Sequence, residues 1–259
     1  VSTDSFRWDV RLNQLFVQGL LKNQGIYMTY DSGKSWEKSN DGLHLHDLET
    51  ILSSPVNPDE LWTGQQAARG MYKSTDAGKN WELFANYLSH YPMKILYFPG
   101  YSNSMIATSS MYYSVMGFSY DSGNTWTMLS AKTFLDLVMR GIHSTKQTFT
   151  KLIVDKARDD DSPKGSIHLH GLAVNPKNID EIFAGSVSDP SVFTDVALRG
   201  VHLFKSKDGG ENWVTIGEGL PFTSNSSIRD IQISPSEPNI IYLGLSEMEA
   251  EDGNGIWKS

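Results

Sequence analysis

Short apolar runs bounded by turn-forming residues recur along the whole chain. One series ends at a proline and occupies residues 48–55, 95–99, 172–176 and 231–235. A second series occupies residues 13–17, 59–64, 103–107, 180–185 and 239–244, and a third occupies residues 25–28, 70–73, 201–205 and 255–258. Runs this short, bounded by Gly, Pro, Asn and Asp, are typical of β-strands. Helical periodicity is confined to one candidate helix at 133–140.

An eight-residue motif, Ser/Thr-x-Asp-x-Gly-x-x-Trp, occurs in four places, and in three of them it directly follows a run of the third series. Its aspartate, glycine and tryptophan are Asp31, Gly33 and Trp36; Asp76, Gly78 and Trp81; Asp121, Gly123 and Trp126; and Asp208, Gly210 and Trp213. The aspartate can accept hydrogen bonds from turn N–H groups, the glycine permits a positive φ, and the tryptophan is expected to pack over the hairpin. These roles are structural, so the motif predicts a hairpin between two strands.

The order of these features predicts one repeated unit. Each unit reads as strand, proline turn, strand, loop, strand, motif and strand. The first three motif aspartates are spaced 45 residues apart. Four antiparallel strands in about 45 residues are typical of one β-propeller blade. The chain is therefore expected to be an all-β propeller with about five visible blades.

The motif resembles the Asp-box, or BNR, repeat of sialidase-like β-propellers. With the segment Asp180-Glu-Ile-Phe-Ala-Gly185 before it, the pattern is similar to a broad group of exported BNR-repeat proteins. That group includes photosystem assembly factors, xyloglucanase-like glycosidases and sortilin-type receptors. The resemblance covers essentially the whole chain and implies the fold. It leaves the function open, because the same blades serve both enzymes and binding modules.

The predicted blades occupy residues 1–45, 46–90, 91–165, 166–224 and 225–259, and the last is incomplete. From Asp121 to Asp208 the interval is 87 residues, which fits either a degenerate blade or an insertion. We favour an insertion at about 128–165, because about 30 extra residues are too few for four ordinary strands. A further ten or so extra residues lie between Gly185 and Val201.

Both insertions are expected at the end of each blade that lies opposite the Asp boxes. Long loops on a rigid scaffold often carry binding residues, so this face is the predicted functional face. The first strand of each blade starts there, and alignment on the proline gives its entry residues: Asp47 and Glu49, Tyr91 and Met93, His168 and His170, and Ser227 and Arg229. Most of them are polar, which is unusual for buried strand positions and predicts a polar channel mouth.

Three kinds of chemistry can be assigned to these residues. His168, His170, Arg229, Tyr91 and Arg69 are the candidate ligand-binding residues. His168 and His170 alternate along a strand, so both imidazoles are expected on one face, where they could hold a metal ion. If the protein is a glycosidase, its paired carboxylates are expected among Asp47, Glu49 and Asp230. A channel lined with solvated polar residues is the simpler interpretation.

Composition excludes several classes of function. The 259 residues include no cysteine, which excludes disulfide scaffolds and thiolate zinc sites. The net charge of −8 argues against a nucleic-acid partner. No apolar run is long enough to span a membrane. No cofactor is expected, apart from the candidate metal. The arginines do not match the sialidase pattern, so sialidase activity is not expected.

Ring closure allows more than one arrangement. The last unit stops at the first residue of a motif, so its fourth strand is missing. Residues 1–10 could supply that strand and close a five-blade ring, or a partner chain could complete the ring. We favour a third interpretation, in which these residues are part of a larger propeller. Each interpretation avoids the exposed strand edge of an open arc.

Taken together, the sequence predicts an exported binding or assembly module that uses the insertion-bearing face. The alternative is a glycan-processing hydrolase with carboxylates on that face, and a metal-dependent activity at His168 and His170 is the third hypothesis. The expected partner is a glycan or a protein. The expected location is extracellular or periplasmic.

Overall fold

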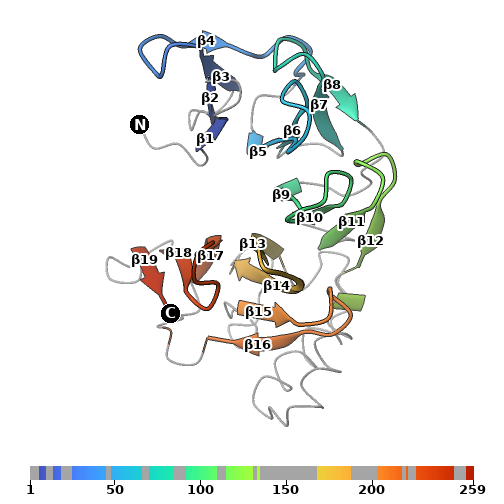
Figure 1. The fold of residues 1–259 in the computed structure, drawn as a ribbon, viewed down its shortest axis with the longest axis vertical. Coiled ribbons are helices and arrows are strands. Elements are labelled where there is room, and N and C mark those ends of the chain that lie inside the picture. The colour runs from blue at the N-terminus through green and yellow to red at the C-terminus, as the bar shows by residue number, and fades with distance from the viewer. Residues whose placement is uncertain are drawn as a thin grey trace. The chain divides into compact units, whose positions relative to one another are not determined.

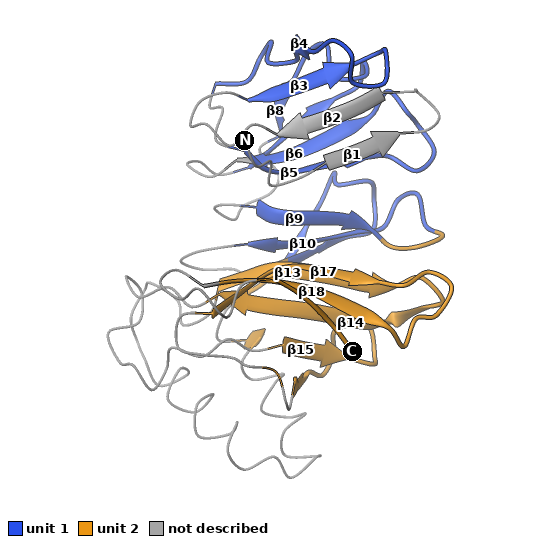
Figure 2. Cartoon of the chain, turned by 90° about the vertical axis from the view of Figure 1, so that its left-hand side faces the viewer, with its two compact units in different colours: residues 1–97, 101–109, 117–128 blue, residues 98–100, 110–116, 129–259 orange. Residues whose placement is uncertain are grey.

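The computed structural model describes residues 6–9, 14–18, 25–44, 48–65, 70–84, 92–109, 115–130, 133–134, 168–187, 203–217, 220, 226–247 and 255–259. The described segments form β-strands joined by turns (Figure 1). Thr133 and Phe134 have helical backbone, and the rest of the predicted helix lies outside the described residues. The chain divides into two compact units, each described below by itself (Figure 2).

Unit 1 contains two complete four-stranded antiparallel sheets and most of a third. The first consists of β1 (Phe6–Asp9), β2 (Gln14–Gln18), β3 (Ile26–Thr29) and β4 (Glu37–Lys38). The second consists of β5 (Leu48–Ser53), β6 (Leu61–Gln65), β7 (Met71–Ser74) and β8 (Glu82–Phe84). The third consists of β9 (Pro92–Tyr97), β10 (Met105–Ser109), β11 (Met116–Ser119) and β12 (Thr127–Leu129). Strands pair in chain order within each sheet, as the repeat predicted.

Unit 2 contains the remaining strands. One group consists of β13 (His168–Asn175), β14 (Asn178–Val187), β15 (Leu203–Ser206) and β16 (Val214–Ile216). The other consists of β17 (Ser226–Ile233), β18 (Ile241–Glu247) and β19 (Gly255–Lys258). A single residue pair, Val187 with Ser227, joins β14 to β17 and makes one seven-stranded sheet of the two groups.

One of the alternatives for the chain ends does not hold among the described residues. Residues 6–9 do not supply a strand to the last group, because β1 pairs with β2 as the inner strand of its own sheet. Trp62 is buried, but Trp257 is 37% exposed because no described strand pairs with the outer edge of β19. The structure describes the backbone of Trp8 but not its side chain.

All four Asp boxes form the predicted hairpin by the same hydrogen bonds. The Ser or Thr hydroxyl donates to the aspartate at 2.7–2.9 Å and accepts from the glycine N–H at 2.8–2.9 Å. The aspartate Oδ1 accepts the N–H of the residue four positions later at 2.8–2.9 Å. The glycines have φ of 81–99°, a region that L residues rarely adopt. The structural roles of the aspartate and the glycine are therefore confirmed.

The four box tryptophans differ from one another, and they do not all make the hairpin contact expected of them. Trp126 and Trp213 donate from Nε1 to Gly123 and Gly210 of their own hairpins at 3.0 Å. Trp81 instead donates to the Ser39 carbonyl at 2.8 Å, on the segment before its sheet. Trp36 is 39% exposed. The ring position depends on what lies beside each hairpin, which the motif does not encode.

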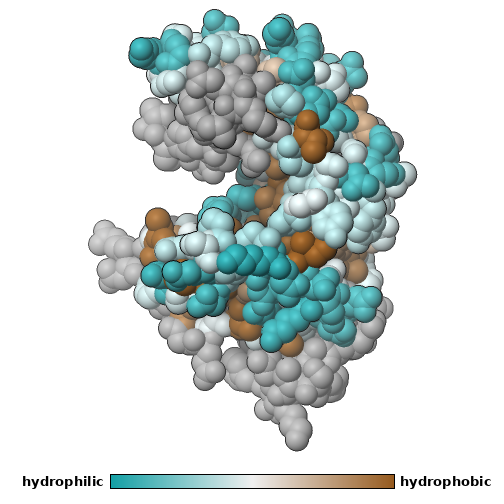
Figure 3. All heavy atoms as spheres, in the orientation of Figure 1, coloured by the Kyte–Doolittle hydropathy of each residue, from teal (hydrophilic) through white to brown (hydrophobic). Residues whose placement is uncertain are grey.

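The cores within each unit lie between adjacent groups of strands. In unit 1, Trp62 packs with Ile95 and Met105. In unit 2, Phe183 packs with Ile228 and Leu243. The face visible in Figure 3 is mainly hydrophilic over the described residues, with separate hydrophobic patches. The apolar strand positions are therefore used mostly for packing between strands.

Candidate functional site

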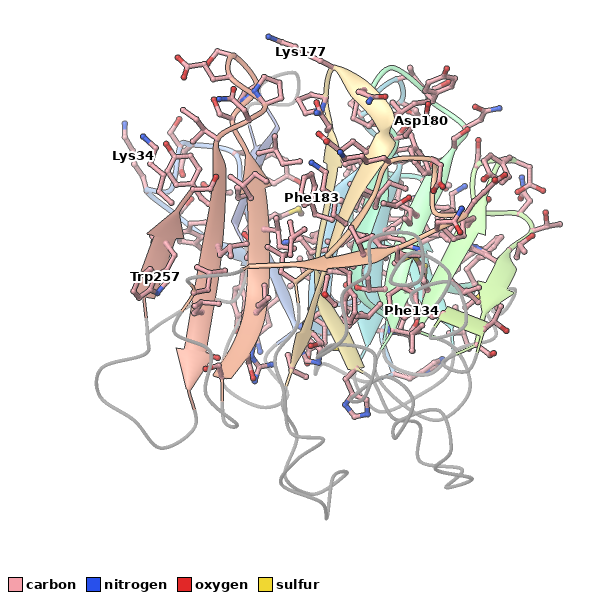
Figure 4. The ribbon with its side chains drawn as sticks, turned by 90° about the horizontal axis from the view of Figure 1, so that it is seen from below. Lys34, Phe134, Lys177, Asp180, Phe183 and Trp257 are labelled. Atoms are coloured by element: carbon pink, nitrogen blue, oxygen red, sulfur yellow. The ribbon has the colours of Figure 1, made fainter. Side chains whose placement is uncertain are left out.

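The Asp boxes lie at one end of the strands, opposite the starts of the first strands. Backbone N–H groups in three boxes donate to the turn between strands one and two: Ala77 to Asp59, Ser122 to Asn103, and Gly209 to Asp180. Figure 4 shows Lys177 and Asp180 at this end of unit 2. Strands β13 and β17 start at the other end, at His168 and Ser226. This arrangement places the predicted entry residues away from the boxes.

A β-bulge interrupts the first strand at the same position in four cases. The register of the ladder skips one residue at each bulge: Glu49 in β5, Met93 in β9, His170 in β13 and Arg229 in β17. Each lies six residues before the proline that ends the first apolar run of its unit, that is, before Pro55, Pro99, Pro176 or Pro235. A bulge bends the strand and changes the direction of a side chain. The same β-bulge therefore recurs at one entry residue of each of these four strands.

The bulge corrects one sequence expectation. His168 and His170 were expected to lie on one face because residues alternate along a regular strand. The ladder instead passes from Leu169–Ser186 to Gly171–Gly185 and leaves His170 out. Simple alternation therefore does not hold between the two histidines. His168 is 2% exposed, whereas His170 is half-buried.

His170 and Arg229 meet across the two first strands of unit 2. Arg229 Nη1 lies 3.0 Å from His170 Nδ1. Arg229 Nε also donates to Ser246 Oγ in β18 at 3.2 Å. Because the guanidinium can only donate, His170 Nδ1 must accept, so the proton of the neutral ring is on Nε2. The pair thus presents the remaining guanidinium N–H groups of Arg229 and the Nε2–H of His170.

The electrostatic environment keeps His170 neutral. Burial lowers its pKa well below the usual 6.5, and the positive charge of Arg229 and the neighbouring His168 lower it further. A neutral imidazole is required for the contact with Arg229. Among the described residues, no carboxylate forms an ion pair with Arg229, whose side chain is exposed. The site therefore combines an exposed cation with a neutral hydrogen-bond donor.

Small hydroxyl side chains surround this pair. Ser227 is the cross-strand partner of Ser246 and also pairs with Val187 of β14. Its hydroxyl is buried and has no hydrogen-bond partner among the residues that the structure describes. An unsatisfied buried hydroxyl is costly unless a ligand or water completes it. Ser227, Ser246, His170 and Arg229 form the candidate site, called the entry cluster below.

The other predicted site residues are distributed as follows. Glu49 lies in unit 1 and Asp230 in unit 2, where Asp230 Oδ2 accepts a hydrogen bond from Gln232 at 2.8 Å. Asp47, Tyr91 and Arg69 lie outside the described residues. No group of three or more potential metal ligands occurs in the part of the chain that the structure describes. The contact with Arg229 occupies the Nδ1 atom of His170.

Two residues with structural roles, Ser246 and Phe134, were not predicted from the sequence. Ser246 joins the entry cluster only through the register of β17 and β18, and no motif marks it. Phe134 anchors the start of the long insertion in unit 2, with ring centroids 5.2 Å from Phe204 and 5.3 Å from Trp213. Figure 4 marks the side chain of Phe134, which is fully buried. Its position within the one segment with helical periodicity was the available signal.

Comparison with known families identifies the family of this chain. A family model described as Sortilin-Vps10 (sortilin, neurotensin receptor 3) matches residues 24–166, more than half of the chain. The chain belongs to the sortilin–Vps10 family. A search of curated proteins finds no match to this Vps10-family chain.

Solved structures show the same fold at low sequence identity. An ancestral GH74 enzyme matches with a TM-score of 0.64 and 16% identity over 95% of the Vps10-family chain and 28% of its own. The GH74 xyloglucanase from Xanthomonas campestris matches with a TM-score of 0.65 and 13% identity over 98% and 36%, respectively. A chain of the COPII outer coat vertex on membranes matches with a TM-score of 0.57 and 9% identity over 94% and 56%. The Vps10-family chain spans about a third of the length of the GH74 enzymes. The β-propeller prediction is confirmed.

The family match also confirms the Asp-box, sialidase-like assignment made from the motif. None of the described helical residues belongs to a helix long and apolar enough to cross a membrane.

Proposed function

We propose that this chain is an exported binding module that recognises an acidic group on a protein partner through the entry cluster. The observation that carries the proposal is the arrangement of Arg229. Nε and Nη1 are held by Ser246 and His170, while the side chain remains exposed. An oriented guanidinium with free N–H groups suits a carboxylate, which it can bind with two parallel hydrogen bonds.

Two further observations support a binding role. The family description names a receptor, and a propeller in the COPII coat belongs to a protein assembly. The His170 Nε2–H adds a neutral donor beside the cation, because Nδ1 of the same ring contacts Arg229. Neutral donors add directional selectivity to the charge attraction of Arg229.

Selection from a phage-displayed library of random peptides tests this proposal. The wild-type chain should enrich peptides with Asp, Glu or a free carboxyl terminus. Arg229→Glu should lose that enrichment and favour Lys and Arg. A selected acidic peptide should bind Arg229→Gln about 10- to 100-fold more weakly, because a charge-assisted hydrogen bond contributes about 1.5–3 kcal/mol.

Lys177→Glu is the matched control. It makes the same change of charge in unit 2 but at the box end, where Lys177 donates to the Ser236 carbonyl. It should leave the selection unchanged. Equal enrichment of acidic peptides by wild type and Arg229→Glu would contradict the proposal, provided that circular dichroism shows that Arg229→Glu and Lys177→Glu are folded.

A glycan-processing hydrolase is the second candidate, supported only by the fold shared with the GH74 enzymes. Asp230 is a described carboxylate that directly follows Arg229 in the sequence. Release of reducing sugar from xyloglucan by wild type, and its loss in Asp230→Asn, would favour this candidate over the binding module.

A further inference from the structure

The strand β19 of unit 2 has an open outer edge. It is the third strand of its group, and the third strands of the other groups, β3, β7, β11 and β15, each pair with an outer strand, β4, β8, β12 and β16. No described residue pairs with the outer edge of β19 (Figure 1). All four residues of β19 are exposed. Such an edge is a template for pairing with another strand.

This edge strand carries two large apolar side chains. Ile256 is 81% exposed, and Trp257, which is marked in Figure 4, is 37% exposed. The repeat aligns Ile256 with Met71 of β7 and Leu203 of β15, which are only 0% and 4% exposed. The position of Ile256 is thus buried in these two groups, both of which have an outer strand.

The hydrogen bonds of β19 show which of its backbone groups face the open edge. The Ser259 N–H donates to the Ile241 carbonyl at 3.0 Å, so these two residues form a hydrogen-bonded pair. Such pairs alternate along an antiparallel ladder, so the backbone of Trp257 bonds to Leu243 of β18, whereas that of Ile256 does not bond to β18. The N–H and C=O of Ile256 therefore point toward the open edge.

The first sheet shows how these groups are satisfied where an outer strand is present. Ile26 of β3 takes the position of Ile256 and donates its N–H to Asn40 Oδ1 at 2.8 Å. Its carbonyl accepts the N–H of Ser39 at 2.9 Å. Both partners directly follow β4. A strand placed beside β19 would satisfy Ile256 in the same way.

The cross-strand partner at this position is apolar in both groups that define it. Phe84 of β8 faces Met71, and Ile216 of β16 faces Leu203. A strand that completes the β19 edge should therefore place a large apolar residue opposite Ile256. A second β19 meets this requirement when it runs antiparallel, because Ile256 then faces its own counterpart. Like charges do not meet in this register, since the two Lys258 residues lie at opposite ends of the pair.

We propose that β19 is a self-association surface through which two copies of this chain form a symmetric dimer. The two strands pair antiparallel about a two-fold axis at Ile256, whose N–H and C=O exchange hydrogen bonds with those of the second copy. A two-fold interface is closed, so association stops at two copies. The proposal goes beyond the binding role of the entry cluster and does not depend on it.

Sedimentation equilibrium of the chain tests the proposal. The apparent mass of wild type should rise with concentration from that of one chain to that of two. Ile256→Pro should remain a monomer, because it removes the N–H that faces the second copy without removing a bond to β18. Ile256→Glu should weaken association about tenfold or more, because like charges would face each other across the axis. Val56→Glu is the matched control, since Val56 is an aliphatic residue, 69% exposed, between β5 and β6.

A mixture of two variants tests the register. Ile256→Glu and Ile256→Lys should each associate weakly alone, but their mixture should form dimers, because opposite charges then meet at the axis. A wild-type mass that stays at one chain at every concentration overturns the proposal. Equal association of Ile256→Glu and Val56→Glu, or no gain in the mixture, overturns the pairing at Ile256. Urea unfolding midpoints equal to that of wild type exclude a folding defect in the Ile256 variants.

Discussion

At the scale of single residues, the absence of a Cβ atom allows neighbouring strand groups to approach closely. Gly185 of β14 lies against Ile228, and a Cβ there would be 2.4 Å from Ile228 Cγ2. Gly64 takes the equivalent position in β6, where a Cβ would be 2.2 Å from the Pro92 carbonyl oxygen. Real Cβ atoms do not approach other atoms this closely. Both glycines are therefore needed for packing rather than for a turn.

Gly185→Ala should destabilise the chain by about 1–3 kcal/mol, because the added methyl group overpacks the contact with Ile228. The free energy of unfolding in urea measures this effect. Gly244→Ala is the matched control, since Gly244 is the equivalent residue of β18 and a Cβ there would meet nothing closer than 3.6 Å. Equal destabilisation by both substitutions would contradict the packing explanation.

At the scale of elements, one aromatic side chain connects the long insertion to its sheet. Phe134 packs at near-perpendicular geometry on Phe204 of β15, with an interplanar angle of 85°, and also contacts the box residue Trp213. Edge-to-face aromatic pairs stabilise beyond their area of burial. The start of the insertion is therefore part of the core of unit 2.

Phe134→Ala should lower the free energy of unfolding by about 3–5 kcal/mol, because it leaves a cavity against two rings. Phe134→Leu should lower it less, since it keeps most of the apolar volume. Chemical denaturation followed by tryptophan fluorescence reports the change directly, because Trp213 is one of the contacts. A loss below about 1 kcal/mol in Phe134→Ala would show that the contact does not anchor the segment.

At the scale of the whole molecule, the four Asp boxes make the fold sensitive to acid. The hydroxyl and N–H of Ser35 lower the pKa of Asp31 to about 2. For Asp208, burial opposes ionisation, but the hydrogen bonds from Asn212 and Ser206 outweigh it and lower the pKa. Asp76 and Asp121 are also lowered. The boxes share this electrostatic behaviour because they share one hydrogen-bond pattern.

A carboxylate with a depressed folded-state pKa contributes stability above its unfolded value of about 3.9, and this contribution is lost as pH falls further. The chain should therefore lose stability between about pH 4 and pH 2. Asp208→Asn should cost about 1 kcal/mol at pH 7, where charge-assisted bonds are lost. The difference from wild type should shrink toward pH 2 in urea titrations. A difference that does not depend on pH would contradict this account.

Much of the fold could be predicted from sequence because its determinants are local. The aspartate, glycine and hydroxyl of each box interact within five residues, so their spacing alone predicts the hairpin. The proline and apolar runs predicted the strand order for the same reason. The entry positions were also predicted, because alignment on Pro176 and Pro235 gave His170 and Arg229.

Tertiary structure decided the features that depend on register and on neighbouring strands. The bulge at His170 changes the direction of a side chain without a motif of its own, because it arises from pairing between strands. Ser246 reaches Arg229 only through the alignment of β17 with β18, and Trp81 turns to Ser39 because of what lies beside its hairpin. Local spacing thus determined the repeated blade, whereas long-range pairing determined which side chains meet at the entry cluster.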